Sequence, residues 1–216
     1  SQPWFPGADR QMQYREGVYI GYRYFDSAQR PVLFPFGHGL SYTEFAISQA
    51  ILSNDTLTAQ GPVKLTVEVQ NTGALDGAEV VQVYRHMKHS ALHRPEQELC
   101  GFAKVHLAAG ASGSVEIDLA PECFQVFDHG QQRWVLEAGG VELRIGVSSR
   151  DIRLRKMLNV ASVDVPSELA TQVARPEFLP ANSNPAIAVS DELFGQMLNG
   201  PVPQGEKVRP FHRNSS

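Results

Sequence analysis

The chain has 216 residues, of which 42% are hydrophobic and 19% charged, and its formal net charge at pH 7 is −4. This composition is typical of a globular protein with one full hydrophobic core and room for a second small unit. The negative charge offers no attraction to nucleic acid or to an anionic membrane surface, and no apolar run reaches the ~18 residues that cross a bilayer. We therefore expect neither nucleic acid nor a membrane as a partner. Two cysteines, Cys100 and Cys123, are too few for a disulfide framework and favour a reducing compartment.

The first part of the chain contains an apolar segment at residues 18–25, which we predict to be a strand. It has no partner strands in this chain, so it would be an edge or terminal strand of a sheet whose remainder lies upstream. Residues 34–42 then combine the aromatic residues Phe34 and Phe36 with a proline and two glycines, which excludes the interior of a regular element. We predict a shaped loop that carries aromatic side chains.

Residues 43–154 consist of short segments with β periodicity. Apolar and polar side chains alternate in residues 63–69, 114–119 and 141–147, which predicts strands with one face on a core and the other in water. Residues 79–84 are apolar on both faces, as in a central strand, and residues 45–52, 99–107 and 124–136 complete the set. Turn residues separate these segments. About seven short strands without a long helical pattern between them predict an antiparallel β-sandwich.

The β pattern fades after residue 154 into a stretch with proline and alanine at residues 165–188. A short helix is predicted next, with Ser190 as its N-cap and two acidic residues at its positive end. Its apolar stripe consists of Leu193, Phe194, Met197 and Leu198, and the sequence NGP at residues 199–201 ends it. Such a short helix is not stable alone and must dock on another part of the protein.

Several motifs together resemble one region of one enzyme family. The sequence EGVYIGYRYFD at residues 16–26 is followed by FPFGHGLSYTEF at 34–45, NTG at 71–73, EVVQVY at 79–84, RP at 94–95 and SSRDI at 148–152. Their order is similar to that in glycoside hydrolase family 3, the β-glucosidase family, where the second catalytic domain ends and a fibronectin type III-like domain begins. The resemblance covers residues 14–155 and, more loosely, residues 210–216. Trp134 follows both cysteines, so the immunoglobulin arrangement of a tryptophan between two cysteines is absent.

The resemblance implies a mainly β chain with three parts. Residues 1–42 would be the end of the α/β sandwich catalytic domain with its exit loop. Residues 43–155 would form a fibronectin type III-like (immunoglobulin-like) antiparallel β-sandwich. Residues 156–216 would be an extended C-terminal extension with the short docking helix.

The resemblance also implies that the catalytic residues lie upstream of this chain. In the family the nucleophile is an aspartate on a barrel domain, and the acid/base is usually a glutamate in the α/β sandwich domain. A retaining mechanism needs two carboxyl groups ~5 to 5.5 Å apart, and neither motif is present here. We therefore predict no catalytic, substrate-binding or metal-binding residue, no cofactor, and no activity of this chain alone.

The expected role is structural. The parent enzyme would hydrolyse terminal non-reducing β-D-glucosyl residues, and the upstream barrel and α/β catalytic domains would be the partners of this chain. An exposed N-terminal strand would also allow a homo-oligomer. For the compartment we favour the bacterial cytoplasm. Two alternatives stay open: an independent carbohydrate-binding or adhesion module, and a family member with another substrate such as β-xylosides.

Some residues invite a more specific interpretation. Asp26 matches the junction segment and no catalytic position, so we interpret it as a surface or turn-stabilising carboxylate. His86, His89 and His93, with Cys100 nearby, have spacings that a zinc site can use, but we expect them to be solvated in a connecting loop. For His38 we favour a hydrogen bond that holds the aromatic loop over contact with a sugar.

An aromatic cluster in the first 36 residues has two interpretations. It is either a platform on which sugar rings stack or, as we favour, a packing surface between domains; its members are Trp4, Tyr19, Tyr22, Tyr24, Phe25, Phe34 and Phe36. Asn54 and Asn214 begin sequences that match the N-glycosylation pattern, which has meaning only in a secreted protein.

Overall fold

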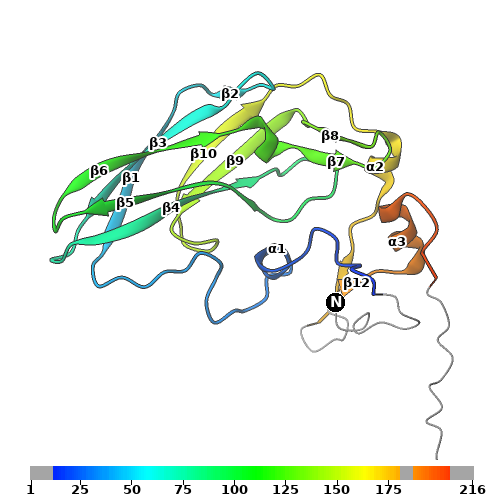
Figure 1. Cartoon of the computed structure of the whole chain (residues 1–216), viewed down its shortest axis with the longest axis horizontal. Coiled ribbons are helices and arrows are strands. Elements are labelled where there is room, and N and C mark those ends of the chain that lie inside the picture. Colours follow the sequence, from blue (N-terminus) through cyan, green and yellow to red (C-terminus); the bar gives the residue numbers. More distant parts are fainter. Residues whose placement is uncertain (1–11, 181–186, 205–216) are drawn as a thin grey trace, which may run out of the picture.

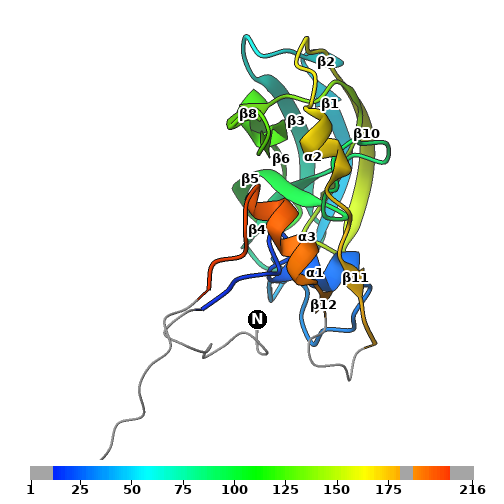
Figure 2. The ribbon, with the colours of Figure 1, turned by 90° about the vertical axis from the view of Figure 1, so that its right-hand side faces the viewer.

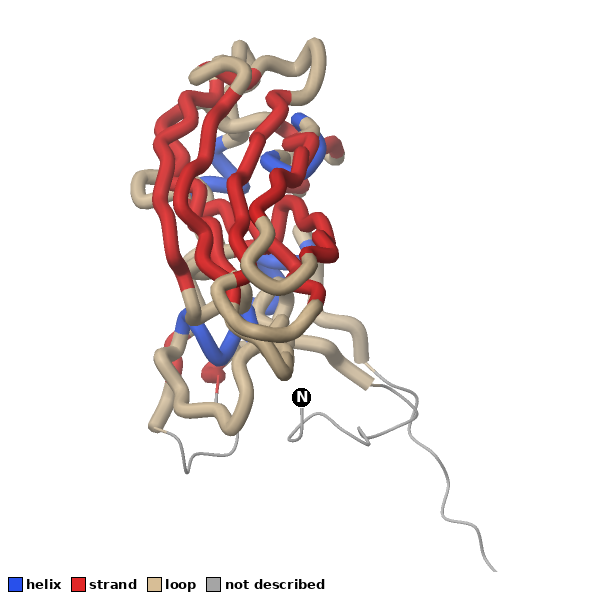
Figure 3. Tube along the Cα trace, turned by 90° about the vertical axis from the view of Figure 1, so that its left-hand side faces the viewer, coloured by secondary structure: helices blue, strands red, loops and turns tan. Residues whose placement is uncertain are grey.

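The structure of the protein is a computed structural model, which describes residues 12–180 and 187–204. Two sheets form a β-sandwich, and the remaining segments lie along one of its sides and one of its ends (Figures 1 and 3). The first sheet has the order β1-β3-β6 and the second the order β2-β10-β9-β4-β5. No helix in the described ranges is long and apolar enough to cross a membrane.

The three-stranded sheet consists of β1 (Phe45–Leu52), β3 (Val63–Asn71) and β6 (Ser112–Leu119), paired antiparallel. Every second residue of β3 from Val63 to Asn71 is buried, as the alternation in its sequence predicts. Its valines and Leu65 face the second sheet and form the main core with Leu119, Leu143 and Ile145. Burial of such side chains is the main stabilising term for a sandwich of this size.

The five-stranded sheet consists of β2 (Thr56–Leu57), β4 (Gly77–His86), β5 (Glu98–Leu107), β9 (Gly139–Gly146) and β10 (Ile152–Val160). β4 lies between β9 and β5 and is buried on both faces in its middle, which confirms it as an interior strand. The antiparallel sandwich predicted from the sequence is therefore confirmed, although β10 continues to Val160, beyond the boundary expected at residue 155.

A hairpin and a C-terminal extension complete the molecule at one end of the sandwich (Figures 1 and 2). The hairpin consists of β7 (Val126–Asp128) and β8 (Arg133–Val135) and follows the 3₁₀ turn η2 (Pro121–Phe124). The extension contains α2 (Glu168–Gln172), the short strands β11 (Glu177–Phe178) and β12 (Ile187–Ala188), and α3 (Asp191–Leu198).

The predicted docking helix is confirmed as α3. The Ser190 hydroxyl accepts a hydrogen bond from the Leu193 N–H at 3.1 Å, and Asn199 ends the helix in a left-handed conformation with φ 53°. Phe194 packs in a second cluster with Tyr19 and Val189, so the helix docks on the N-terminal segment.

The predicted strand at residues 18–25 is wrong. Residues 22–27 instead form the helix α1 (Tyr22–Ser27), which begins after Gly21, a residue with φ 53°. The helix satisfies its backbone groups locally, for example through the Ala28 N–H and the Tyr24 carbonyl at 2.8 Å, whereas a lone strand has no such partner. Because the described residues form no strand at this place, the exposed strand through which we expected two copies to pair is not present there.

Candidate functional site

The base of the aromatic loop, residues 34–42, is fixed to the outer face of the five-stranded sheet. The Gln82 side-chain amide donates to the carbonyls of Gly37 at 3.0 Å and Val147 at 2.7 Å, and the Ser149 N–H donates to the Phe36 carbonyl at 2.9 Å. Gly37 has φ 79°, and a Cβ at this position would overlap the side-chain amide of Gln82. The loop therefore requires glycine at position 37.

Stacked aromatic rings also attach the loop to the sheet. The ring of Phe36 stacks on Tyr22 with centroids 4.5 Å apart, and Tyr22 meets the edge of Tyr84 at 6.0 Å. The Tyr84 hydroxyl donates to the Gln82 side-chain oxygen at 2.5 Å, and burial raises the pKa of Tyr84, so this hydroxyl keeps its proton at neutral pH. One end of the loop thus forms a rigid stack on β4.

The outer part of the same loop projects apolar side chains into solvent. Leu40 and Tyr42 are 91% and 98% exposed, Phe34 is also exposed, and Leu33, directly before the loop, is 93% exposed. The His38 ring stacks on Phe34 at 5.2 Å, and the backbone N–H of His38, not its ring, donates to the Pro35 carbonyl at 3.1 Å. The loop thus combines a fixed base with exposed apolar tips.

Asp26 is not a surface carboxylate. Its side chain is buried and accepts from the Arg150 guanidinium at 2.8 Å and from the Gln97 amide at 3.2 Å. Arg150 also donates to the carbonyls of Phe25 at 3.2 Å and Arg30 at 2.7 Å. Asp26 therefore ties α1 to the turn between β9 and β10, and our interpretation of it as a surface group is corrected.

Two further side chains of α1 accept hydrogen bonds from the backbone around the start of β5. The Leu99 N–H donates to the Tyr22 hydroxyl and the Glu96 N–H donates to the Ser27 hydroxyl, both at 2.8 Å. These bonds satisfy backbone groups of the sandwich with side chains of the N-terminal segment. The segment before residue 43 is thereby attached to the sandwich at several points.

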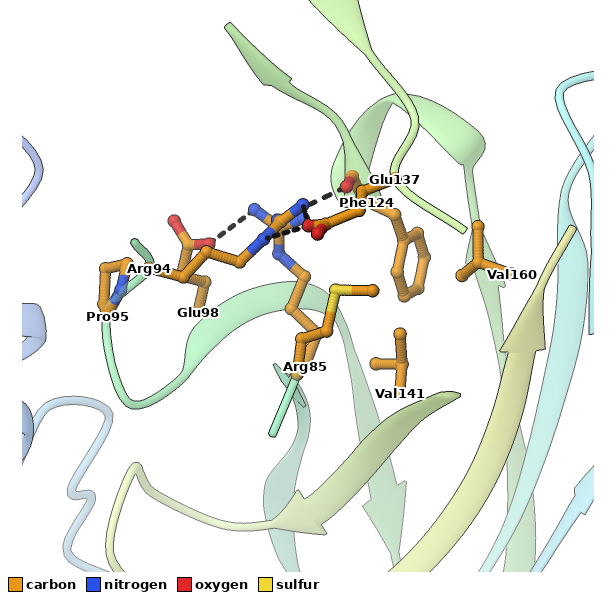
Figure 4. A pocket seen from close by; sticks show the side chains of 9 residues that line it. Arg85, Arg94, Pro95, Glu98, Phe124, Glu137, Val141 and Val160 are labelled. Carbon is orange, nitrogen blue, oxygen red and sulfur yellow. Dashed lines mark hydrogen bonds and ion pairs between the residues drawn. The ribbon is translucent and has the colours of Figure 1, made fainter. Parts of the chain in front are cut away.

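A charged cluster lies at the end of the sandwich core (Figure 4). Glu98 pairs with Arg85 at 2.5 Å and with Arg23 of α1 at 3.5 Å. Glu137 pairs with Arg94 at 3.0 Å and also accepts from the Ala91 N–H at 2.6 Å. Each carboxylate faces a guanidinium, so the cluster is an ion-pair network.

The three histidines and Cys100 do not converge on one point. His86 Nδ1 lies 2.6 Å from the Glu96 carbonyl oxygen, His89 is exposed, and the His93 ring stacks on Tyr19 at 6.2 Å. Burial lowers the pKa of His93 and raises the pKa of the Cys100 thiol to about 12, so this thiol is protonated and donates to the Val83 carbonyl. Only His89 is solvated as expected. No three His, Cys, Asp or Glu side chains within the described ranges are grouped so that they could hold a metal ion.

The aromatic residues divide into separate groups instead of forming one platform. Tyr19 and Tyr24 pack against Phe178 with centroids 5.1 and 5.9 Å away, whereas Tyr22 and Phe36 stack on β4. Phe25 meets the edge of Tyr24 at 5.2 Å. Trp4 lies outside the described residues.

The two possible glycosylation positions differ in what the structure describes. Asn54 is exposed, and its side-chain oxygen accepts from the Thr56 N–H at 3.0 Å. Asn214 lies outside the described residues.

Sequence analysis missed Gln82, Gln97 and Arg150, which hold the junction together. A signal was present at Gln82, because a polar residue in the middle of a strand buried on both faces must have a hydrogen-bond partner. Gln97 and Arg150 gave no such signal, because their hydrogen-bond partners lie far away in the sequence.

Comparisons with known proteins agree with this architecture. The family model of the fibronectin type III-like domain matches residues 79–149. The chain is 39% identical over 158 residues to thermostable beta-glucosidase B of Acetivibrio thermocellus, a match that covers 73% of this chain and 21% of the relative. It is 40% identical over 148 residues to an exo-alpha-(1->6)-L-arabinopyranosidase of Bifidobacterium longum, with 68% and 19% covered.

A solved structure shows the same relationship in three dimensions. The GH3 beta-glucosidase of Bifidobacterium adolescentis superposes with a TM-score of 0.70 at 36% identity, covering 79% of this chain and 26% of that chain. The chain thus spans about a fifth of the length of the curated relatives it matches. The junction motifs, the sandwich and these matches agree, and the chain belongs to the C-terminal region of glycoside hydrolase family 3, including its fibronectin type III-like domain.

Proposed function

We propose that this chain is the C-terminal structural part of a β-glucosidase-like enzyme, where it docks on the upstream barrel and α/β catalytic domains and stabilises their arrangement. The observation that carries the proposal is the aromatic loop at residues 34–42. Its base is held by Gln82 and Ser149, while Leu40 and Tyr42 present apolar surface without cover from the described part of the chain. Apolar side chains exposed this fully on a fixed loop favour burial against a partner.

The carboxylates of the chain support a non-catalytic role. Asp26, Glu98 and Glu137 are each bound by arginine, which commits these buried carboxylates to ion pairs, whereas a retaining mechanism needs one carboxyl group as nucleophile and another as acid/base. We expect the purified chain not to hydrolyse aryl β-glucosides. Turnover above the buffer rate that Asp26→Asn abolishes would contradict this.

Our proposal for the substrate of the whole enzyme rests on the names of similar proteins. One similar protein is named a beta-glucosidase and another an arabinopyranosidase, so enzymes with different substrates contain this region. A β-D-glucoside is our proposal for the parent substrate, and another glycoside such as a β-xyloside is the alternative.

A comparison of two proteins tests the docking role. Leu40→Ser and Tyr42→Ser should change the free energy of unfolding of this chain by no more than ~0.5 kcal/mol, because both side chains are exposed in it. In the full-length enzyme the same substitutions should lower the melting temperature, because the side chains would be buried at a domain interface. Val163→Ser, at a residue that is just as exposed but follows the last sandwich strand, is the matched control.

Two outcomes would count against the proposal. If both loop variants left the melting temperature of the full-length enzyme unchanged, the loop would not be a docking surface. If they lowered kcat/KM with an unchanged melting temperature, the loop would belong to the active site. Binding of the isolated chain to insoluble polysaccharide would favour the alternative function of a carbohydrate-binding module.

A further inference from the structure

We propose that the chain contains a second site, separate from the aromatic loop, that binds a planar aromatic compound carrying one or a few hydroxyl groups. The site is a cavity of about 600 Å³ between the β7–β8 hairpin, the start of β5 and the helices α2 and α3. Its size is within the roughly 300 to 1,000 Å³ of cavities that bind small molecules. Pockets of that kind are lined mainly by apolar and aromatic side chains with a few polar groups.

One wall of the cavity is aromatic. The ring of Phe127 meets Trp134 at 5.6 Å and His129 at 5.3 Å, in both cases edge to face. Trp134 remains 59% exposed although it belongs to a strand, and it lines the cavity. An accessible indole ring held by a neighbouring ring is a surface on which another flat ring can stack.

A further part of the lining comes from the C-terminal extension. Val173 follows α2, and Phe194 and Met197 belong to the apolar stripe of α3. The thioether of methionine adapts its shape to a ring and makes favourable contacts with aromatic faces. The docked extension thus contributes apolar side chains to the cavity that Trp134 also lines, which is a role of α3 beyond covering the N-terminal segment.

The polar groups of the cavity decide which ligand fits. Arg85, Arg94 and Glu98 line the cavity, and all three are engaged in the ion-pair network that Figure 4 shows. An anionic ligand would have to compete with Glu98 and Glu137 for these arginines, although Arg85 Nη1 has no partner in the described part of the chain. The side chains of Glu122 and Gln125 also line the cavity and, within the described part of the chain, make no hydrogen bond, so they can accept from a hydroxyl group.

This lining favours a hydroxylated aromatic ring over a saccharide. A saccharide carries hydroxyl groups around its whole ring. The lining does contain polar side chains, Tyr14, Arg23, His93 and His129 among them, but hydroxyl groups that faced Val126, Phe127, Val173 or Met197 would lose water without a partner at a cost in desolvation. An aromatic ring can stack on the exposed indole of Trp134 and contact the apolar side chains of the same cavity, Met197 among them, while its few hydroxyl groups reach Glu122 and Gln125. Apolar stacking therefore provides the affinity and the two polar side chains fix the orientation.

Calorimetric titration of the whole 216-residue chain with 2-naphthol, and separately with cellobiose, tests the site. We expect saturable 1:1 binding of 2-naphthol and no binding heat from cellobiose. Trp134→Ala should weaken 2-naphthol binding by about tenfold, because it removes the stacking surface. Val173→Phe should also weaken binding, because the larger side chain would fill part of the cavity. Phe102→Ala is the matched control, because Phe102 is 66% exposed on β5 and does not line the cavity.

A second measurement separates binding from misfolding. The chain has two tryptophans, so its ¹H–¹⁵N spectrum contains two indole signals, of which Trp134→Ala removes one. That signal should shift with 2-naphthol while the signal of Trp4 stays in place. The proposal is overturned if 2-naphthol does not bind saturably, if binding is unchanged in Trp134→Ala and Val173→Phe, or if cellobiose binds through Trp134 instead. It is also overturned if binding appears only in Trp4→Ala, because the chain's own N-terminal segment would then fill the cavity.

Discussion

The carboxylate of Asp128 accepts hydrogen bonds from both the hydroxyl and the backbone N–H of Ser167, at 2.6 and 2.7 Å. It also accepts from the N–H groups of Gly130 and Gln131 in the turn of the β7–β8 hairpin, at 2.8 and 3.0 Å. Ser167 is the N-cap of α2 and accepts from the Ala170 N–H at 3.2 Å. One buried carboxylate therefore joins the hairpin of the sandwich to the first helix of the C-terminal extension.

This carboxylate should make the stability of the chain depend on pH. Burial alone would raise the pKa of Asp128, but the hydrogen bonds from Ser167, Gln131 and Gly130 outweigh it and lower the pKa from 3.8 to about 2. A lowered folded-state pKa means that the stabilisation is present above about pH 4 and is lost as the pH falls towards 2. In urea unfolding from pH 7 to 2.5, the difference between wild type and Asp128→Asn should be largest above pH 4 and shrink below it.

Asp118→Asn is the control for this titration, because Asp118 is exposed on β6. Its difference from wild type should be small at every pH. A difference for Asp128→Asn that did not change between pH 7 and 2.5 would show that the charge of Asp128 does not stabilise the fold.

Gly37→Ala should destabilise the aromatic loop, and Gly39→Ala should not. Gly37 has a positive φ and its Cβ would overlap Gln82, whereas a Cβ on Gly39 would meet no atom within 4 Å. A non-glycine residue in a strained conformation costs roughly 1 to 3 kcal/mol, and the overlap would also displace the Gln82 amide from two carbonyls. Equilibrium unfolding of both variants measures this. Equal stability of the two variants would mean that the loop base is not fixed in the way described.

The sandwich could be predicted from the sequence because each strand carries its own signal. Period-two alternation in residues 63–69 depends only on which side chains face the core, and β3 follows it residue by residue. The helix α3 could also be predicted from local signals, because Ser190 and Asn199 mark its two ends in the sequence. The error at residues 18–25 has a physical reason: an apolar aromatic run suits a strand, but a strand needs a neighbour, and here the backbone closes a helical turn after Gly21 instead.

The contacts that attach the flanking segments could not be predicted in this way. Asp26 and Arg150 are 124 residues apart, and Asp128 and Ser167 are 39 apart, so no local pattern connects them. The cavity beside Trp134 is hidden for the same reason, because its walls come from a hairpin and from a helix that follows much later. These features depend on packing between elements and become visible only in three dimensions.

The docking of α3 should be lost locally when Phe194 is replaced. Phe194 is buried against Tyr19 and Val189, and the Arg15 guanidinium lies 4.9 Å from the centre of its ring, whereas Leu198 on the same helix is 45% exposed. Phe194→Ala should reduce hydrogen-exchange protection in α3 while β3 stays protected, since a docked segment can open without global unfolding. Leu198→Ala is the control and should leave protection in α3 nearly unchanged. Equal protection of α3 in wild type and Phe194→Ala would contradict the docking.

The buried charge of Glu98 should contribute far more to stability than a surface ion pair of similar geometry. Glu98 contacts Arg85 at 2.5 Å and Arg23 at 3.5 Å, and the side chains of Glu98 and Arg85 are almost completely buried. Glu98→Gln keeps the shape but leaves the Arg85 charge without compensation in the interior, where another of its nitrogens, Nη1, already has no partner in the described part of the chain. Breaking such a pair typically costs ~3 to 5 kcal/mol.

Glu116→Gln provides the comparison for this prediction, because Glu116 pairs with Lys64 at 2.8 Å while both side chains are about half exposed. Its cost should be at most ~1 kcal/mol. A double variant, Arg85→Met with Glu98→Leu, should regain most of the stability lost in Glu98→Gln, because apolar side chains of similar size remove both buried charges together. Urea unfolding of the three variants measures all of these values. If Glu98→Gln were no more destabilising than Glu116→Gln, the ion-pair network in Figure 4 would contribute no more to the free energy of unfolding than a surface pair. The contact of Glu98 with Arg23 would then not stabilise the attachment of α1.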